Sequence, residues 1–167
     1  MAGVTALTPY SRYVRRMPEI TDLHETVDIT ASPERVWALV TDLPRMASWS
    51  PQGVRTFVRG PVGLGTRALN VNRSGWKVWP TRSKVVRFEP HRDFAFRIKD
   101  NGVIWSYALE PTGAGTRVTH RRETPDGITP VSLRLQDTVL GGVDRFTGEL
   151  RDGMRATLTR IKAEAEG

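Results

Sequence analysis

A histidine and an arginine two positions apart are the residues of this chain best placed to do chemistry. Residues 116–123 form a strand-like run in which Val118 is the strongest core candidate, and alternation puts His120 and Arg122 on its face. A buried His beside a cation loses its proton readily. His120 would then be a general base, with Arg122 and Tyr107 as further catalytic candidates, in an aldol-type cyclisation of a poly-β-ketone. The plainer interpretation, which we favour from the sequence, is a His at a rim and an Arg that reaches solvent.

Aromatic and apolar side chains form the second candidate site. Several of them alternate along strand-like runs or recur along the last helical pattern, and together they would line a small-molecule pocket of roughly a few hundred Å3. The alternative is that they fill the core, where each aromatic ring buries roughly 150–250 Å2. The set comprises Trp76, Trp79, Phe94, Phe96, Trp105, Tyr107, Phe146, Leu150 and Met154.

Polar residues on two neighbouring strands are the third candidate, and their orientation is open. One parity turns Ala68, Asn70 and Asn72 inward, whereas the other buries Leu69 and Val71 and is the plainer reading of hydrophobicity. In the first case Asn72 would offer a ligand one donor and one acceptor. On the following strand Trp79, Thr81, Ser83 and Val85 share a face, where the hydroxyls of Thr81 and Ser83 would either contact a ligand or form ordinary strand surface.

Other kinds of chemistry find no support in the sequence. The three histidines are not at metal-ligand spacing, and the chain has no Cys, which excludes disulfides and Cys-ligated metals. The Gly-rich stretches at 63–65 and 113–115 resemble hairpin turns and not phosphate loops. We therefore expect no metal and no cofactor. The absence of Cys is compatible with a reducing cytoplasm, where we expect the protein.

The net charge and hydropathy narrow the possible partners. The formal charge of +7 invites a nucleic-acid interpretation, but the cations are nearly all Arg, and we interpret them as scattered among acidic residues. We therefore expect a solvated, Arg-biased surface and no nucleic-acid partner. We identify no signal peptide and no run of the ~20 apolar residues that a membrane helix needs, so we expect no membrane insertion.

The elements that would position these residues follow from periodicity. We expect an N-terminal arm over residues 1–20 and a single domain over 21–167. Ser32 before Pro33 predicts a helix start, and Asp42 with Pro44 ends that helix before a second short one. The predicted strands are 23–29, 54–59, 66–73, 76–89, 93–99, 103–109 and 116–123, followed by a short helix at 131–140 and a long amphipathic helix at 143–165.

Two glycines interrupt the last helical pattern. Gly148 and Gly153 each cost a helix ~1 kcal/mol relative to Ala, so they need a reason. Either the helix packs closely on the sheet there, or the glycines leave room for something bulky. We favour close packing from the sequence.

Four stretches, in this order, resemble one superfamily. They are Ala31-Ser32-Pro33-Glu34-Arg35-Val36-Trp37 with Asp42 and Trp49; Gly63-x-Gly65-Thr66-Arg67 with Asn72-Arg73; Trp105-Ser106-Tyr107-x-Leu109-Glu110; and Gly113-x-Gly115-Thr116-Arg117-Val118-Thr119. They are similar to the START-like helix-grip superfamily (SRPBCC), and within it to the actinobacterial polyketide cyclase/dehydrase and lipid transport group. The resemblance implies an α+β helix-grip fold, in which a curved antiparallel sheet wraps around a long C-terminal helix and encloses a hydrophobic cavity. It also favours the parity that turns Ala68 inward, because similar chains carry a larger inward apolar residue at that position.

Three functions follow as hypotheses. The first is a carrier or binder of a small hydrophobic molecule, a lipid or a polyketide-like compound, in the cavity between sheet and helix. The second is an enzyme, a polyketide cyclase, aromatase or dehydratase, that acts in the same cavity. The third is a module that binds protein or RNA through its basic surface or N-terminal arm. The sequence leaves the oligomeric state open.

Overall fold

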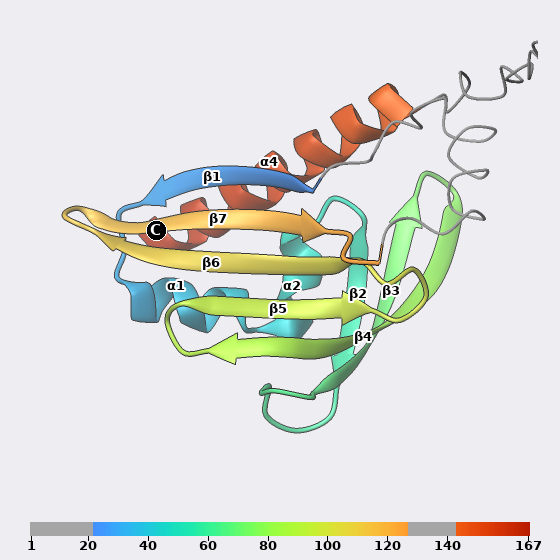
Figure 1. The fold of residues 1–167 in the computed structure, drawn as a ribbon, viewed down its shortest axis with the longest axis horizontal. Helices are drawn as coiled ribbons and strands as arrows, with labels where there is room; N and C mark the ends of the chain where they lie inside the picture. Colours follow the sequence, from blue (N-terminus) through green and yellow to red (C-terminus); the bar gives the residue numbers. More distant parts are fainter. Residues whose placement is uncertain (1–21, 127–142) are drawn as a thin grey trace, which may run out of the picture.

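The fold is a curved antiparallel sheet with helices on its concave side (Figure 1). The computed structural model describes residues 22–126 and 143–167, without the side chains of residues 143–146. The seven strands pair in the order β1-β7-β6-β5-β4-β3-β2. The α+β helix-grip architecture predicted from the sequence is confirmed. The expected arm at residues 1–20 and the expected helix at 131–140 lie outside the described residues.

The described elements follow the predicted order closely. The strands are β1 (Leu23–Ile29), β2 (Gly53–Val58), β3 (Arg67–Ser74), β4 (Lys77–Glu89), β5 (Asp93–Ile98), β6 (Ile104–Thr112) and β7 (Gly115–Glu123), and the helices are α1 (Pro33–Val40), α2 (Leu43–Trp49) and α4 (Val143–Glu166). The Asn101-Gly102 pair, a strong hairpin signal in the sequence, lies in the turn between β5 and β6, where Gly102 adopts a φ of 73° that favours glycine.

Side-chain caps start both short helices. The Ser32 hydroxyl accepts a hydrogen bond from the backbone N–H of Arg35 at 3.3 Å and begins α1. The Asp42 carboxylate accepts from the N–H of Arg45 at 3.1 Å, so this residue both follows the end of α1 and caps α2. Polar links hold α2 to α4: the Trp49 Nε1–H donates to the Glu164 carboxylate at 2.7 Å, and Arg160 donates to the Trp49 carbonyl at 2.9 Å.

The core lies between the sheet and the helices. Phe94 is fully buried, and its ring meets the edge of Trp37 from α1 at a centroid separation of 6.3 Å. Leu158 and Ile161 bring the apolar stripe of α4 into the same cluster. In Figure 1, α4 lies along β1 and β7 at one end of the sheet. Within the part of the chain that the structure describes, no helix has the length and apolar character to cross a bilayer.

Candidate functional site

A cavity of about 230 Å3 lies between the concave face of the sheet, α2 and α4. One wall is apolar and comes mainly from β5, β6 and α4: Phe96, Ile98, Trp105, Tyr107, Leu150 and Met154. A second wall comes from α2 and the turn that follows it: Met46, Ala47, Ser50, Pro51, Gln52 and Gly53. The core therefore does not close completely at this end of the sheet.

A ladder of side-chain hydrogen bonds forms the polar wall. Thr56 donates to the Asn70 Oδ1 at 3.1 Å, and the Asn70 Nδ2 donates to the Ser83 hydroxyl at 3.1 Å. The Asn72 Nδ2 donates to the Thr81 hydroxyl at 3.0 Å. Asn70, Asn72 and Thr81 line the cavity. Asn72 keeps its Oδ1 without a partner among the described residues, and this oxygen is an acceptor available to a ligand.

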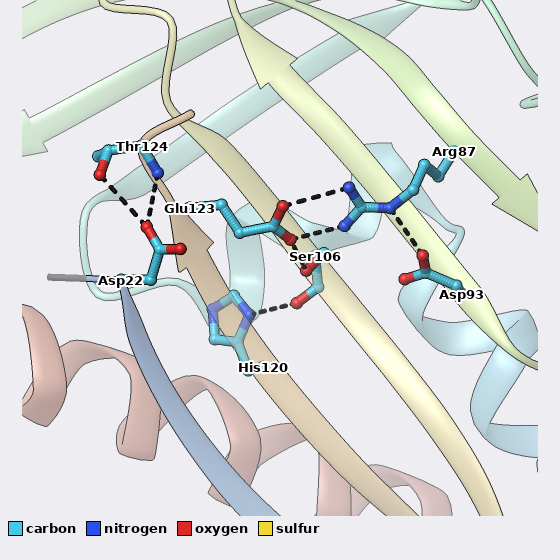
Figure 2. Close-up of polar contacts among 7 residues, drawn as sticks. All are labelled: Asp22, Arg87, Asp93, Ser106, His120, Glu123 and Thr124. Carbon is cyan, nitrogen blue, oxygen red and sulfur yellow. Dashed lines mark hydrogen bonds and ion pairs between the residues drawn. The ribbon is translucent and has the colours of Figure 1, made fainter. Parts of the chain in front are cut away.

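The imidazole of His120 lies on the cavity wall and is held in one orientation. It stacks on Tyr107 with 4.3 Å between ring centroids and on Trp105 with 5.4 Å. Its Nδ1 lies 3.1 Å from the Ser106 carbonyl oxygen, as Figure 2 shows. Since a carbonyl only accepts, Nδ1 carries the proton, and in the neutral ring Nε2 keeps a lone pair.

Burial sets the protonation states of both stacked rings. Burial lowers the pKa of His120 to about 4, against the smaller opposing effect of the hydrogen bond to Ser106. Burial also raises the pKa of Tyr107 well above its ordinary value. At neutral pH the cavity therefore presents a neutral imidazole, which accepts, and a neutral phenol, which donates and has no hydrogen-bond partner among the described residues.

Arg122 is buried as deeply as His120 but does not line the cavity. It is 5% exposed and His120 4%, so the sequence-based interpretation of a rim His and a solvent-reaching Arg is wrong. The Arg122 Nη1 is buried without a hydrogen-bond partner among the described residues. Burial lowers the pKa of this guanidinium, and the charge of Asp22 only partly offsets the effect. The cavity wall includes His120 and Tyr107 but no Arg among the described residues.

Ser106 connects the cavity side of the sheet to an ion-pair network on the outer side (Figure 2). While its carbonyl accepts from His120, its hydroxyl donates to the Glu123 carboxylate at 2.8 Å. Glu123 binds Arg87 in two contacts of 2.6 and 3.2 Å, and Arg87 also binds Asp93 at 2.6 Å. The bond to Glu123 raises the pKa of Arg87. This network fixes the peptide that orients the imidazole.

Ion pairs join β1 to α4 beside the strand that carries His120. Glu25 pairs with His120 across β1 and β7. Its carboxylate binds Arg151 at 2.9 Å and Arg155 at 3.0 Å. Burial tends to raise the pKa of Glu25, but the hydrogen bonds from the two arginines outweigh it and the pKa is lowered. The ion pairs hold α4 against β1.

The structure brings together most, but not all, of the residues predicted from the sequence. Those that line the cavity are Asn70, Asn72, Thr81, Phe96, Trp105, Tyr107, His120, Leu150 and Met154. Ala68 is buried and Leu69 is 44% exposed, so the parity favoured by the resemblance is the observed one. The side chain of Phe146 lies outside the described residues.

Five of the candidate residues lie elsewhere. Phe94 packs in the core against Trp37 and Phe88. Trp79, Ala68 and Ser83 share the concave side of the sheet but do not line the cavity. Trp76, also assigned to the aromatic pocket, lies at the turn between β3 and β4 and is 86% exposed. Hydrophobic character and strand parity therefore did not suffice to predict which of these side chains reach the cavity.

The glycines of α4 have different surroundings from those expected. A Cβ atom on Gly148 would meet nothing within 4 Å, and one on Gly153 would meet only the Pro51 ring at 3.9 Å. Close packing on the sheet is therefore not the reason for either residue. Gly153 lines the cavity, where its missing side chain leaves volume. Among the described residues, no group of three potential metal-ligating side chains converges on any point.

Comparisons with known proteins agree with this geometry. A family model described as polyketide cyclase/dehydrase and lipid transport matches residues 21–166. The fold is similar to the di-domain ARO/CYC StfQ from the steffimycin biosynthetic pathway, with a TM-score of 0.70, 17% identity, and coverage of 87% of this chain and 50% of that one. The fold is also similar to the di-domain ARO/CYC BexL from the BE-7585A biosynthetic pathway. Here the TM-score is 0.69 and the identity 21%, with coverage of 88% of this chain and 50% of that one. The chain thus spans about half the length of these two proteins.

A single-unit relative of similar length is also known. The Polyketide_cyc-like protein Cgl2372 from Corynebacterium glutamicum has a TM-score of 0.59 and 28% identity, with coverage of 87% of this chain and 91% of that one. No curated protein sequence matches the chain significantly.

Proposed function

The chain belongs to the polyketide cyclase/dehydrase and lipid transport family, and we propose that it binds a small, hydroxylated, polyketide-like molecule in the cavity beneath α4. The observation that supports this most is the pairing of an apolar wall with a few oriented polar groups, as is typical of small-molecule sites. Apolar contact with Phe96, Trp105 and Met154 supplies most of the affinity, at roughly 25 cal/mol per Å2 buried. The polar groups set the orientation.

The polar groups define the chemistry of the ligand. The Asn72 Oδ1 and the His120 Nε2 both accept hydrogen bonds, so they suit hydroxyl groups of a ligand. The Tyr107 hydroxyl stays protonated and suits a carbonyl oxygen. A molecule with ring hydroxyls and a ketone meets both requirements, whereas a plain acyl chain leaves the buried Tyr107 and His120 and the half-buried Asn72 unpaired. An unpaired buried group costs about 1–3 kcal/mol, which favours the oxygenated ligand.

Filling the cavity from α4 is expected to abolish binding. Gly153→Leu places a branched side chain where Gly153 now leaves volume, because only Pro51 is near. Gly148→Leu is the matched control, since Gly148 lies on the same helix, exposed and away from the cavity. Titration of both variants with hydroxylated aromatic polyketides, followed by calorimetry, measures the difference. Equal affinities of the two variants for the ligand would show that the cavity is not the binding site.

A second candidate function is catalysis of a ring closure by His120. The observation that favours it is a neutral imidazole with one fixed tautomer and a free Nε2 at the cavity wall. Such a group accepts a proton from the activated carbon of a poly-β-ketone while the Tyr107 hydroxyl hydrogen-bonds the developing enolate. Arg122 does not line the cavity, so the set proposed from sequence is reduced here to His120 and Tyr107.

Turnover of a linear poly-β-ketone separates the two functions. If His120 is a base, His120→Asn loses cyclised product although the Asn amide still donates to the Ser106 carbonyl. Ligand affinity measured in the same variant should change much less than turnover. If the wild-type protein binds the compound but forms no product above the uncatalysed rate, the protein is a carrier.

A further inference from the structure

The positive charge of this chain is concentrated in one segment. Residues 43–88 carry nine of the 25 Lys and Arg residues and none of the 18 Asp and Glu residues. The rest of the chain therefore has 16 cations against 18 acids, a net charge of −2. The sequence-based interpretation of scattered, interleaved charge is wrong for this segment, which covers α2, β2, β3 and most of β4.

The same segment carries the exposed apolar side chains. Among the described residues, the large hydrophobic side chains with high exposure are Val54, Phe57, Leu64, Leu69, Trp76 and Val78. Trp76 at the β3–β4 turn and Leu64 in the β2–β3 connection are 86% and 72% exposed. Exposed apolar groups that cluster on one surface usually mark an interaction site. Here they coincide with the excess of positive charge.

Strand register places these two kinds of side chain on one face. Phe57 pairs with Leu69, and Leu69 pairs with Arg82, all opposite in parity to the inward Asn70. Arg67, Lys84 and Arg97 form a row of three cations across β3, β4 and β5. We call this outer surface of β2, β3 and β4, together with Arg97 of β5 and the β2–β3 and β3–β4 turns, the basic-apolar face. It lies at the end of the sheet opposite β1 (Figure 1).

The cations of this face are only partly neutralised. Asp100 pairs with Arg82, and Asp126 pairs with Arg97. The row formed by Arg67, Lys84 and Arg97 lines a depression on the outer surface together with further cations. Cations directly opposite one another repel, so a surface of this kind gains from an anionic partner.

We propose that the basic-apolar face docks on the surface of a bilayer that contains anionic phospholipids. The cations attract the lipid phosphates, and Phe57, Leu69 and Trp76 enter the boundary between head groups and acyl chains. Trp76 has the indole that prefers this boundary, and the Lys77 ammonium lies 5.8 Å from its ring centroid. Nucleic acid fits the charge but not the aliphatic Leu64, Leu69 and Val78. The docking is independent of which molecule the cavity holds.

Vesicle sedimentation tests the proposal on the full chain. We expect binding to vesicles of phosphatidylcholine mixed with phosphatidylglycerol, little binding to phosphatidylcholine alone, and weakening as salt screens the charges. The triple variant Arg67→Gln, Arg73→Gln, Lys84→Gln should bind about 100-fold more weakly, from a factor of roughly five for each cation lost. Trp76→Ser should weaken binding with the charge unchanged.

A charge-matched control makes the result specific. The triple variant Arg92→Gln, Arg117→Gln, Lys162→Gln removes three cations outside this face and should bind like the wild type apart from the nonspecific effect of net charge. Equal losses in the two triple variants would overturn the proposal, as would failure to bind anionic vesicles at low salt. Binding to a single-stranded RNA but not to vesicles would also overturn it, and would assign the face to nucleic acid.

Discussion

Replacement of Arg122 by Met should make the protein more stable, raising its free energy of unfolding by about 1–4 kcal/mol. The guanidinium is buried, and its Nη1 has no hydrogen-bond partner in the described part of the chain. Burial of a charge without a partner costs several kcal/mol, and Met keeps the apolar length of the Arg stem without that cost. Urea unfolding of the two proteins at neutral pH measures the gain.

Arg87 is the matched control for this prediction. It is the same residue type, but its side chain binds both Glu123 and Asp93. Arg87→Met should therefore destabilise the protein, because it leaves two carboxylates without their cation. If Arg122→Met is also destabilising, the attraction of the guanidinium to Asp22 outweighs the cost of its burial, and the prediction is wrong. If it is stabilising and ligand binding or turnover falls, Arg122 is retained for function at the expense of stability.

Acidification should destabilise the protein through His120 before the carboxylates are protonated. The pKa of His120 is about 4 in the folded protein, below the ordinary value of 6.5 that applies to the unfolded chain. As pH falls through 6.5 the unfolded chain takes up a proton that the folded protein does not, so its stability falls until the pH reaches the folded pKa. Between about pH 7.5 and pH 4.5 the loss amounts to about 2.5 kcal/mol for this group.

The chosen pH range isolates the histidine. Glu25 and Glu123 have lowered pKa values, so their contributions are present above the ordinary value of 4.5 and are lost only below it. His120→Asn should therefore flatten the dependence of unfolding free energy on pH in this range. An unaltered slope in His120→Asn would mean that the folded protein accommodates the imidazolium ion.

Local signals in the sequence were enough to predict most of the fold. Ser32 before Pro33 starts a helix because its hydroxyl satisfies a free N–H, and Asn101-Gly102 forms a hairpin because Gly102 tolerates positive φ. These signals depend only on residues close together in the sequence, so the tertiary structure does not alter the helix start or the turn that they predict. The strand order also follows, since short turns make consecutive antiparallel strands adjacent in space.

The site was harder to predict because it depends on distance across the fold. Phe94 and Phe96 alternate on one strand face, yet only Phe96 lines the cavity, because α1 covers Phe94. Met46 and Gly53 line it because α2 turns back onto β2, which no pattern in the strands indicates. Burial of His120 and Arg122 likewise comes from elements distant in sequence, so hydropathy alone placed them at the surface.

Gly153 separates the size of the cavity from the identity of its polar groups in this chain. In the proposed binding mode, Asn72, Tyr107 and His120 on the strands set which oxygen atoms of a ligand are recognised, whereas Gly153 on the helix sets how much space the ligand has. Since a side chain at Gly153 would meet only the Pro51 ring, a single substitution there reduces the volume of the cavity without disturbing any strand. The volume of the cavity and the polar groups that line it can therefore change independently of each other.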